Sequence, residues 1–298
     1  MKFQKYNALD NLINGDFLVL GGSGWFGTSA INLLLKSGVS KARIKVISRN
    51  RRQSQLWIDK NLQTIDFSEL ECLEVKKDSI ILNCTGMNRH LIDSLGSERF
   101  TRESNELRLS IKQLILRNPK VSSIHFSSGA SQFYDVNSDL YALHKALDET
   151  SYLQSLDFVS SLILIRAWSV TGGYVSNPDQ YMFSHFIQKR LLDEQVTISN
   201  PNTLRKYVSV EQALLLSLLL AKSSGSKIVN TSGELIDSVS LAELIGCKFE
   251  VNQEPILSGN SYFTKDDSIF ELFAAHGIVY WDIVRQIEET KYVLKSRL

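Results

Sequence analysis

The sequence LVLGGSGWFGTSAINLLL, residues 18–35, carries an apolar run directly into a turn rich in glycine. Gly21, Gly24 and Gly27 are evenly spaced there, and a helix-like apolar pattern follows. Glycine costs conformational entropy on folding, so three of them are expected only where a side chain would obstruct the turn or a ligand. A strand, a tight turn and a helix N-terminus together form an anion site, because backbone N–H groups and the helix dipole face a phosphate. This stretch therefore predicts a nucleotide-binding turn.

The three glycines have separate expected roles in such a turn. Gly21 permits the tight turn, Gly24 lets the backbone approach a pyrophosphate, and Gly27 lets the helix pack close to the sheet. The residues between them complete the predicted cofactor loop: Ser23, Trp25 and Phe26. The alternative is a tight strand-to-helix turn that binds no ligand, since this glycine spacing is weakly specific by itself.

Strand-like and helix-like segments alternate along the first 170 residues. The patterns predict strands at 17–22, 43–48, 78–86, 121–129 and 160–170, and helices at 28–38, 104–118 and 138–156. Buried strands that alternate with helices indicate a parallel sheet with right-handed crossovers. The predicted fold class is therefore α/β, with a Rossmann-type doubly wound parallel sheet. After residue 171 the pattern breaks into shorter pieces.

Composition limits the partners and the compartment. The 298 residues carry a formal net charge of +1, which gives no reason to expect DNA, RNA or an anionic membrane surface as a partner. Cys72, Cys84 and Cys247 lie too far apart for a disulfide framework or a zinc site, so we expect a reducing compartment and no metal.

The N-terminus is too polar for a signal peptide. The apolar run at 213–221 is shorter than the roughly 20 residues of a membrane span and predicts a buried helix. A cytoplasmic location is expected.

The end of the second predicted strand indicates which cofactor the turn would bind. An NAD site usually has an acidic residue there for the ribose 2′-hydroxyl, whereas this chain reads VISRNRRQ at 46–53. Arginine favours a 2′-phosphate, so Ser48, Arg49 and Arg52 predict NADP, with NAD as the alternative. A solvated basic loop would give the same pattern. Further along the chain, Asp66 and Phe67 are weaker candidates for contact with the adenine.

A second group of polar residues follows in YALHK, residues 141–145. The spacing places Tyr141 and Lys145 on one helical face, where a lysine ammonium favours the phenolate and readies the tyrosine for proton transfer. The lysine is also placed to reach the nicotinamide ribose. Upstream, Ser127 and Ser128 end a strand, where a hydroxyl can bind a substrate oxygen; Ser128 is the first choice, but the pattern leaves both open. Two surface residues on an amphipathic helix are the alternative for the YxxxK pair.

These motifs, taken in order, resemble the extended short-chain dehydrogenases/reductases that act on nucleoside-diphosphate sugars. GGSGWFG resembles the cofactor loop of that family, and SS…YALHK its Ser-Tyr-Lys triad. The resemblance extends past the cofactor half, to IRAWSVTGG at 165–173, RKYVSVEQA at 205–213, IVNTSG at 228–233 and SVSLAELI at 238–245. It implies that Arg205 meets the phosphates of the sugar nucleotide, with His185 as a further candidate substrate contact. The alternative for His185 is a structural histidine.

The resemblance also implies an organisation and a partner. A cofactor domain would take residues 1–170 and regain 206–232, while 171–205 and 233–298 would form a smaller sugar-nucleotide domain. A homodimer packed through the helices at 104–118 and 138–156 is implied, as is a role in cell-surface polysaccharide biosynthesis.

Three functions are compatible with these motifs. The first choice is an NADP-dependent 4-ketoreductase, in which Tyr141 is the general acid, Ser128 polarises the carbonyl and Lys145 activates the tyrosine. An NAD(P)-dependent 4-epimerase would use the same three residues in both directions. A non-catalytic NADP-binding sensor or scaffold is the alternative of another class. Dehydration is not expected, because Gly129 and Ala130 stand where dehydratases of this family carry an acidic pair.

Overall fold

The computed structural model describes residues 15–49, 61–223, 225–252 and 261–297. The chain divides into two compact units. The larger unit comprises Met1–Arg166 and Ser217–Val229, and the smaller comprises Ala167–Leu216 and Asn230–Leu298. The functions expected of the two domains stay predictions.

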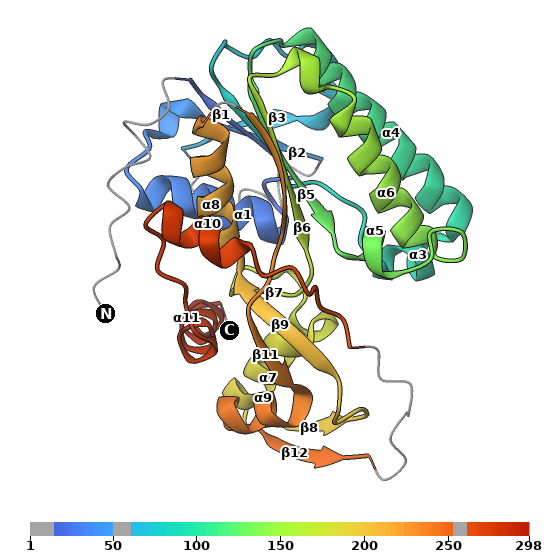
Figure 1. Cartoon of the computed structure of the whole chain (residues 1–298), viewed down its shortest axis with the longest axis vertical. Coiled ribbons are helices and arrows are strands. Elements are labelled where there is room, and N and C mark those ends of the chain that lie inside the picture. Colours follow the sequence, from blue (N-terminus) through green and yellow to red (C-terminus); the bar gives the residue numbers. More distant parts are fainter. Residues whose placement is uncertain (1–14, 50–60, 224, 253–260, 298) are drawn as a thin grey trace. The chain divides into compact units, whose positions relative to one another are not determined.

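A seven-stranded sheet forms the middle of the larger unit in its described part, in the order β10-β6-β5-β4-β1-β2-β3 (Figure 1). Neighbouring strands from β3 to β5 all pair in parallel. Six of the seven follow the order 3-2-1-4-5-6 of the doubly wound dinucleotide fold, which confirms the predicted fold class. The strands are β1 (Phe17–Leu20), β2 (Ile44–Ser48), β3 (Gln63–Asp66), β4 (Ile80–Asn83), β5 (Ser122–Ser128), β6 (Ser161–Ala167) and β10 (Gly225–Asn230).

Helices cover both faces of this sheet. Figure 1 shows α4 and α6 side by side along one face, with α1 on the other. Alternate strand residues serve the two faces: Leu18 and Leu20 join the cluster under α4 and α6, whereas Val46 packs near α1. The described α-helices that lie wholly in the larger unit are α1 (Trp25–Lys36), α3 (His90–Leu95), α4 (Ser97–Arg117), α5 (Ala130–Phe133) and α6 (Leu140–Leu153).

Two helices begin earlier than the sequence pattern predicts. The expected helix at 28–38 starts at Trp25, because Gly27 lies inside its first turn rather than before it. The expected helix at 104–118 starts at Ser97. Its first two turns are polar on the solvent side and bury a single large side chain, Phe100, so they lack the apolar repeat by which a helix is recognised.

The described residues of the smaller unit form two small sheets and a set of helices. One sheet has the order β11-β9-β7, and the other pairs β12 with β8. Its strands are β7 (Val170–Thr171), β8 (Gln195–Ile198), β9 (Leu204–Ser209), β11 (Glu234–Asp237) and β12 (Lys248–Val251). Its helices are α7 (Met182–Leu191), α9 (Ser238–Ile245), α10 (Ile269–Ala275) and α11 (Ile283–Lys295), together with the first part of α8 (Val210–Lys222).

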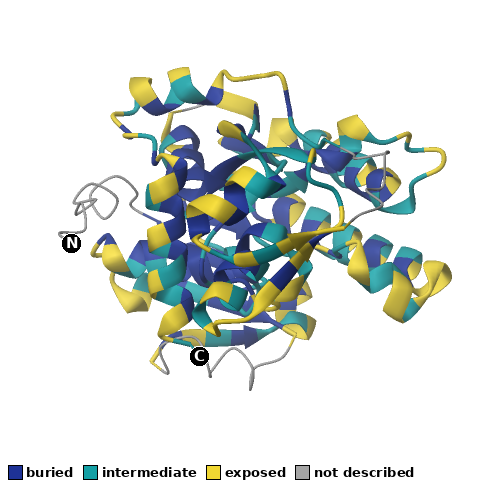
Figure 2. Cartoon of the chain, turned by 90° about the horizontal axis from the view of Figure 1, so that it is seen from below, coloured by how far each residue is buried: buried dark blue, intermediate teal, exposed yellow. Residues whose placement is uncertain are grey.

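The predicted buried helix at 213–221 is confirmed as the greater part of α8. Leu214, Leu216 and Leu218 have no exposed surface. Figure 2 shows the same contrast along the chain, with buried residues along the strands of the large sheet and exposed residues on the outer sides of helices. Among the described residues, no helix is both long and apolar enough to cross a bilayer.

Candidate functional site

The glycine turn after β1 has the geometry of an open helix N-terminus. Gly21 has φ of +75°, and its N–H and that of Gly22 both donate to the carbonyl of Ile47 on β2, at 2.9 and 3.2 Å. A Cβ on Gly27 would lie 2.2 Å from the carbonyl oxygen of Gly21, so only glycine lets α1 pack this closely. A Cβ on Gly24 would meet a single neighbour, the same oxygen, at 3.3 Å.

This turn fits the pyrophosphate of a dinucleotide. Gly24 is the N-cap of α1, and no side chain among the described residues caps the helix at this end. The N-terminus of a helix favours an anion, because first-turn N–H groups point away from the helix and the helix dipole is positive there. The sequence pattern did not single out Gly22, where a Cβ would lie 2.2 Å from Cγ1 of Val46. That glycine serves the packing of the turn onto β2.

Two of the residues expected to select the cofactor, Ser48 and Arg49, lie at the end of β2. Ser48 is buried, and its hydroxyl lies 3.1 Å from the hydroxyl of Ser23 in the turn. The side chain of Arg49 is 62% exposed, and its guanidinium is 3.6 Å from the carboxylate of Glu103. Such an exposed pair holds the arginine weakly, so a ligand phosphate can compete for it. Arg52 lies outside the described residues.

Asp66 and Phe67 are adjacent to this region. The parallel register places Asp66 beside Ser48. Its carboxylate accepts a hydrogen bond from the backbone N–H of Ser68 at 3.0 Å and so caps the short 3₁₀ helix Phe67–Cys72. Phe67 packs against the core under the sheet. The adenine contact of these two residues stays a prediction.

Tyr141 and Lys145 lie in the first two turns of α6, as the spacing predicts. The ammonium of Lys145 is 5.6 Å from the centre of the Tyr141 ring. Its side chain is only 8% exposed, and its Nζ lies 3.8 Å from the carboxylate of Asp148, one turn along the helix. Burial in contact with both a phenol and a carboxylate distinguishes this lysine from a solvated surface residue.

The two candidate serines have different surroundings. Ser127 donates to the carboxylate of Glu149 at 2.7 Å, and Ser131 donates to the same oxygen at 2.8 Å. The other oxygen of Glu149 accepts from Arg166, with distances of 3.0 Å to Nε and 2.7 Å to Nη2. Ser127 is half-buried and belongs to a structural network around Glu149. Ser128 is buried, and its hydroxyl accepts from the N–H of Ala130 at 3.2 Å. Which of the two serines contacts a ligand stays a prediction.

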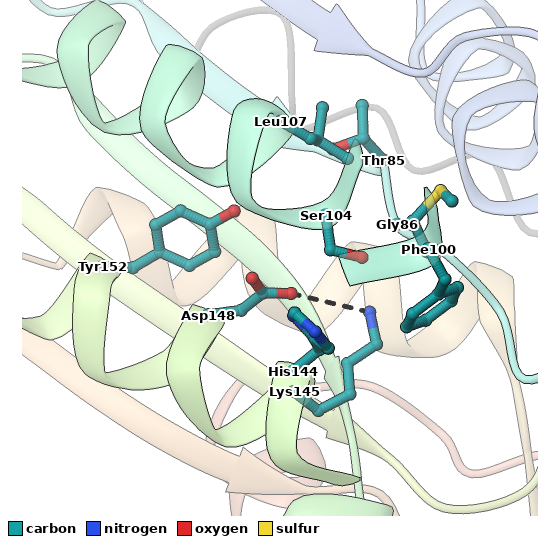
Figure 3. Close-up of a pocket in the computed structure, with 10 residues that line it drawn as sticks. Thr85, Gly86, Phe100, Ser104, Leu107, His144, Lys145, Asp148 and Tyr152 are labelled. Carbon is teal, nitrogen blue, oxygen red and sulfur yellow. Dashed lines mark ion pairs between the residues drawn. The ribbon is translucent and has the colours of Figure 1, made fainter. Parts of the chain in front are cut away.

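A small pocket lies against the buried side of Lys145 (Figure 3). Figure 3 shows the lysine ammonium directed toward Asp148, the ion pair marked by the dashed line. A Cβ on Gly86 would lie 3.0 Å from the lysine Nζ, so this glycine leaves room for the ammonium. The pocket is lined by Thr85, Gly86, Met87, Phe100, Ser104, Leu107, His144, Lys145, Asp148 and Tyr152.

Charged side chains on α4 and α6 form hydrogen bonds with one another at the wall of this pocket. Arg108 donates to the carboxylate of Asp148 at 3.0 Å, and its Nη2 lies 3.2 Å from Nδ1 of His144. Burial lowers the pKa of His144 below its usual range, and the nearby Arg108 acts in the same direction. Asp148 therefore accepts a hydrogen bond from Arg108 and also forms an ion pair with Lys145.

A buried polar chain supports the loop after β4. Nδ2 of Asn83 lies 3.0 Å from Nδ1 of His125, while Oδ1 of Asn83 accepts from the N–H of Thr85 at 3.2 Å. The amide must then donate to Nδ1, which leaves the histidine proton on Nε2, 2.7 Å from the hydroxyl of Ser123. Burial lowers the pKa of His125 to about 3. The ring is neutral and stacks on Tyr152 at 3.9 Å.

The two predicted substrate contacts belong to the smaller unit. Arg205 lies on β9, and its guanidinium is 5.6 Å from the ring centre of Tyr262. The ring of Tyr262 in turn lies 5.1 Å from that of Trp168. Nδ1 of His185, on α7, is 2.8 Å from the carboxylate of Asp179. Both substrate roles stay predictions.

Comparison with known proteins identifies the fold. No protein-family model matches the sequence, and no curated protein sequence matches it significantly. Many solved structures match the structure of this chain. UDP-glucose 4-epimerase from Thermus thermophilus, solved with NAD, is 17% identical over 95% of this chain and 100% of its own, with a TM-score of 0.72. The chain has the fold of nucleotide-sugar epimerases.

Two further solved structures show the same likeness. UDP-N-acetylglucosamine 4-epimerase from Methanobrevibacter ruminantium, in complex with UDP-N-acetylmuramic acid, is 18% identical over 96% of this chain and 100% of its own, with a TM-score of 0.71. MoeE5, in complex with UDP-glucose and NAD, is 15% identical over 95% of this chain and 99% of its own, with a TM-score of 0.72. The resemblance stated from the motifs is confirmed at the level of the fold.

Several residues of the site were not predicted from the sequence. Asp148 could have been found, because its spacing of three from Lys145 places both on one face of α6. Arg108 and Gly86 had no such signal, since each meets its partner only after distant segments pack together.

Proposed function

We propose that this protein is a nicotinamide-dependent oxidoreductase of nucleoside-diphosphate sugars, and that it inverts the configuration at C4. The observation that carries the proposal is the buried Lys145 against the ring of Tyr141, on a fold shared with UDP-sugar 4-epimerases. The comparisons support epimerisation better than 4-keto reduction, which was the first choice from sequence. They also favour NAD, since two of these solved structures contain it.

The residues present fit a dinucleotide. The turn from Gly21 to Gly27 would hold the pyrophosphate, and Ser48 with Arg49 would border the adenosine ribose. Lys145 would hold the ribose at the nicotinamide end. When bound, the nicotinamide ring supplies the hydride acceptor and donor that C4 requires.

Side chains of this protein would transfer the proton to and from the C4 oxygen. Tyr141 accepts the proton of the C4 hydroxyl as that carbon is oxidised, and returns a proton when the carbon is reduced on its other face. Ser128 donates a hydrogen bond to the same oxygen and stabilises it while it carries charge. The ammonium of Lys145, held near Tyr141, stabilises the phenolate between the two steps.

A 4-ketoreductase is the second candidate, and one observation favours it. The end of β2 carries Ser48 and the exposed Arg49 instead of an acidic residue, which suits the 2′-phosphate of NADPH. A reductase exchanges its cofactor at every turnover, whereas an epimerase regenerates it. Cofactor consumption therefore separates the two candidates.

The test combines substrate panels with one substitution. Purified protein is incubated with UDP-glucose, UDP-N-acetylglucosamine or UDP-glucuronic acid and catalytic NAD, and in parallel with 4-keto nucleotide sugars and NADPH. C4 epimers formed without net cofactor consumption support the proposal, and stoichiometric loss of NADPH supports the reductase. Tyr141→Phe should lower turnover by about 10² to 10⁴ and keep cofactor binding. Cofactor binding without turnover on any substrate would indicate the non-catalytic module.

The predicted homodimer is part of this proposal. Leu109 and Leu116 on α4, and Leu143 and Leu147 on α6, are 56%, 36%, 36% and 40% exposed. Leucines gathered on two adjacent helices form the kind of face that a second copy covers. Leu109→Glu with Leu147→Glu should convert a dimer to a monomer in sedimentation analysis. Cytoplasmic location and a role in cell-surface polysaccharide biosynthesis stay predictions.

A further inference from the structure

Arg89 contacts the ring of Tyr141 from the loop that follows β4. Its guanidinium carbon lies 5.2 Å from the centre of the Tyr141 ring and 4.8 Å from that of Tyr134. Its Nη1 donates to the carboxylate of Asp139 at 2.7 Å. Tyr141 therefore lies close to two cations, Arg89 and Lys145, that come from different segments of the chain.

Asp139 anchors the arginine to the helix that carries Tyr141. One oxygen of Asp139 accepts from the N–H of Ala142 at 2.8 Å and caps α6, while the other accepts from Arg89. The Asp139 side chain is 15% exposed. Because Asp139 is the N-cap of α6 and Tyr141 lies in its first turn, the carboxylate holds the guanidinium beside the tyrosine ring. The positive end of the helix dipole stabilises the negative charge of Asp139.

We propose that Arg89 is a positioning residue for Tyr141, a role that rests on the proposed function of that tyrosine. A guanidinium near an aromatic ring is attracted more strongly as the ring gains negative charge. The contact therefore stabilises the phenolate more than the phenol, and strengthens at the step in which Tyr141 releases its proton. The same contact fixes the ring orientation in both directions of the reaction.

Exposure argues against a purely structural role. The Arg89 side chain is 46% exposed, and ion pairs with so exposed a partner add little to stability. Arg99 offers a matched control: it is 58% exposed and forms a comparable ion pair with Glu103 at 2.7 Å, away from any described contact with Tyr141.

The experiment compares Arg89→Met, Arg89→Lys and Arg99→Met, using the member of the UDP-sugar panel that the wild type converts fastest. Arg89→Met should lower kcat by about tenfold, with KM and cofactor Kd within about twofold of wild type. Arg89→Lys should recover most of the loss, and Arg99→Met should match the wild type. Normal kcat in Arg89→Met, or a loss confined to KM, overturns the proposal.

A double-mutant cycle shows whether Arg89 acts through Tyr141. In the Tyr141→Phe background, Arg89→Met should cause no further loss, because the group it serves is absent. A further tenfold loss there would mean that Arg89 binds the substrate directly, and the proposal would be wrong. Wild-type turnover in Tyr141→Phe overturns the proposed function and this role together. An impaired Tyr141→Phe with a normal Arg89→Met overturns the role of Arg89 alone.

Discussion

Replacing Glu149 with alanine should destabilise the larger unit by about 3 kcal/mol, because it removes one partner of a buried ion pair. Glu149 is 6% exposed, and the side chain of Arg166 is 15% exposed. The variant leaves the guanidinium without its bidentate partner, and also leaves the hydroxyls of Ser127 and Ser131 without their acceptor. Breaking a buried pair costs roughly 3–5 kcal/mol, and the lower end applies because Arg166 retains some access to water.

Hydrogen exchange measures this change in the larger unit alone. Peptides covering β5 and β6 should lose protection in Glu149→Ala by an amount that corresponds to the predicted free energy. Glu103→Ala is the control, since its side chain is 22% exposed and its loss should cost at most about 1 kcal/mol. If the two variants lose equal protection, Glu149 does not stabilise the segment that carries Ser127 and Ser131, and the structural role of Ser127 fails.

Three further predictions concern the turn, the cofactor and pH. Gly24→Ala should weaken dinucleotide binding in calorimetry while the protein stays folded, whereas Gly27→Ala should lower the melting temperature, because its Cβ would lie 2.2 Å from a backbone oxygen. Arg49→Ala should raise the Kd of NADPH and leave that of NADH unchanged; equal effects would exclude a 2′-phosphate contact. Burial lowers the pKa of His125 from 6.5 to about 3, so the unfolded chain binds a proton that the folded chain does not. Urea denaturation should therefore show stability falling as pH drops below about 6.5, by up to about 1.4 kcal/mol per pH unit, and His125→Phe should flatten that slope. The pKa of His144 is also lowered and acts in the same direction, so part of the slope remains.

Local patterns in the chain predicted five strands of the parallel sheet, β1, β2, β4, β5 and β6, and the glycine-rich turn after β1, but they did not indicate β3. The apolar run before Gly21, and the alternation of strands with helices, both depend on neighbours within a few residues. The YxxxK spacing likewise placed Tyr141 and Lys145 together, since four residues span about one helical turn. Helix starts were less predictable: Trp25 and Ser97 begin helices where glycine or polar residues mask the apolar repeat.

The partners of these residues were decided only by tertiary packing. Arg89 meets Tyr141, Arg108 meets Asp148, and Glu149 meets Arg166 from segments that are distant in sequence or on different elements. No periodicity links such residues, because their contact depends on how whole strands and helices pack. An isolated arginine or glutamate has the same local pattern whether it is solvated or buried. Ser127 and Ser128 show the same limit: adjacent strand residues point to opposite faces of a sheet, and the sequence does not indicate which face meets a ligand.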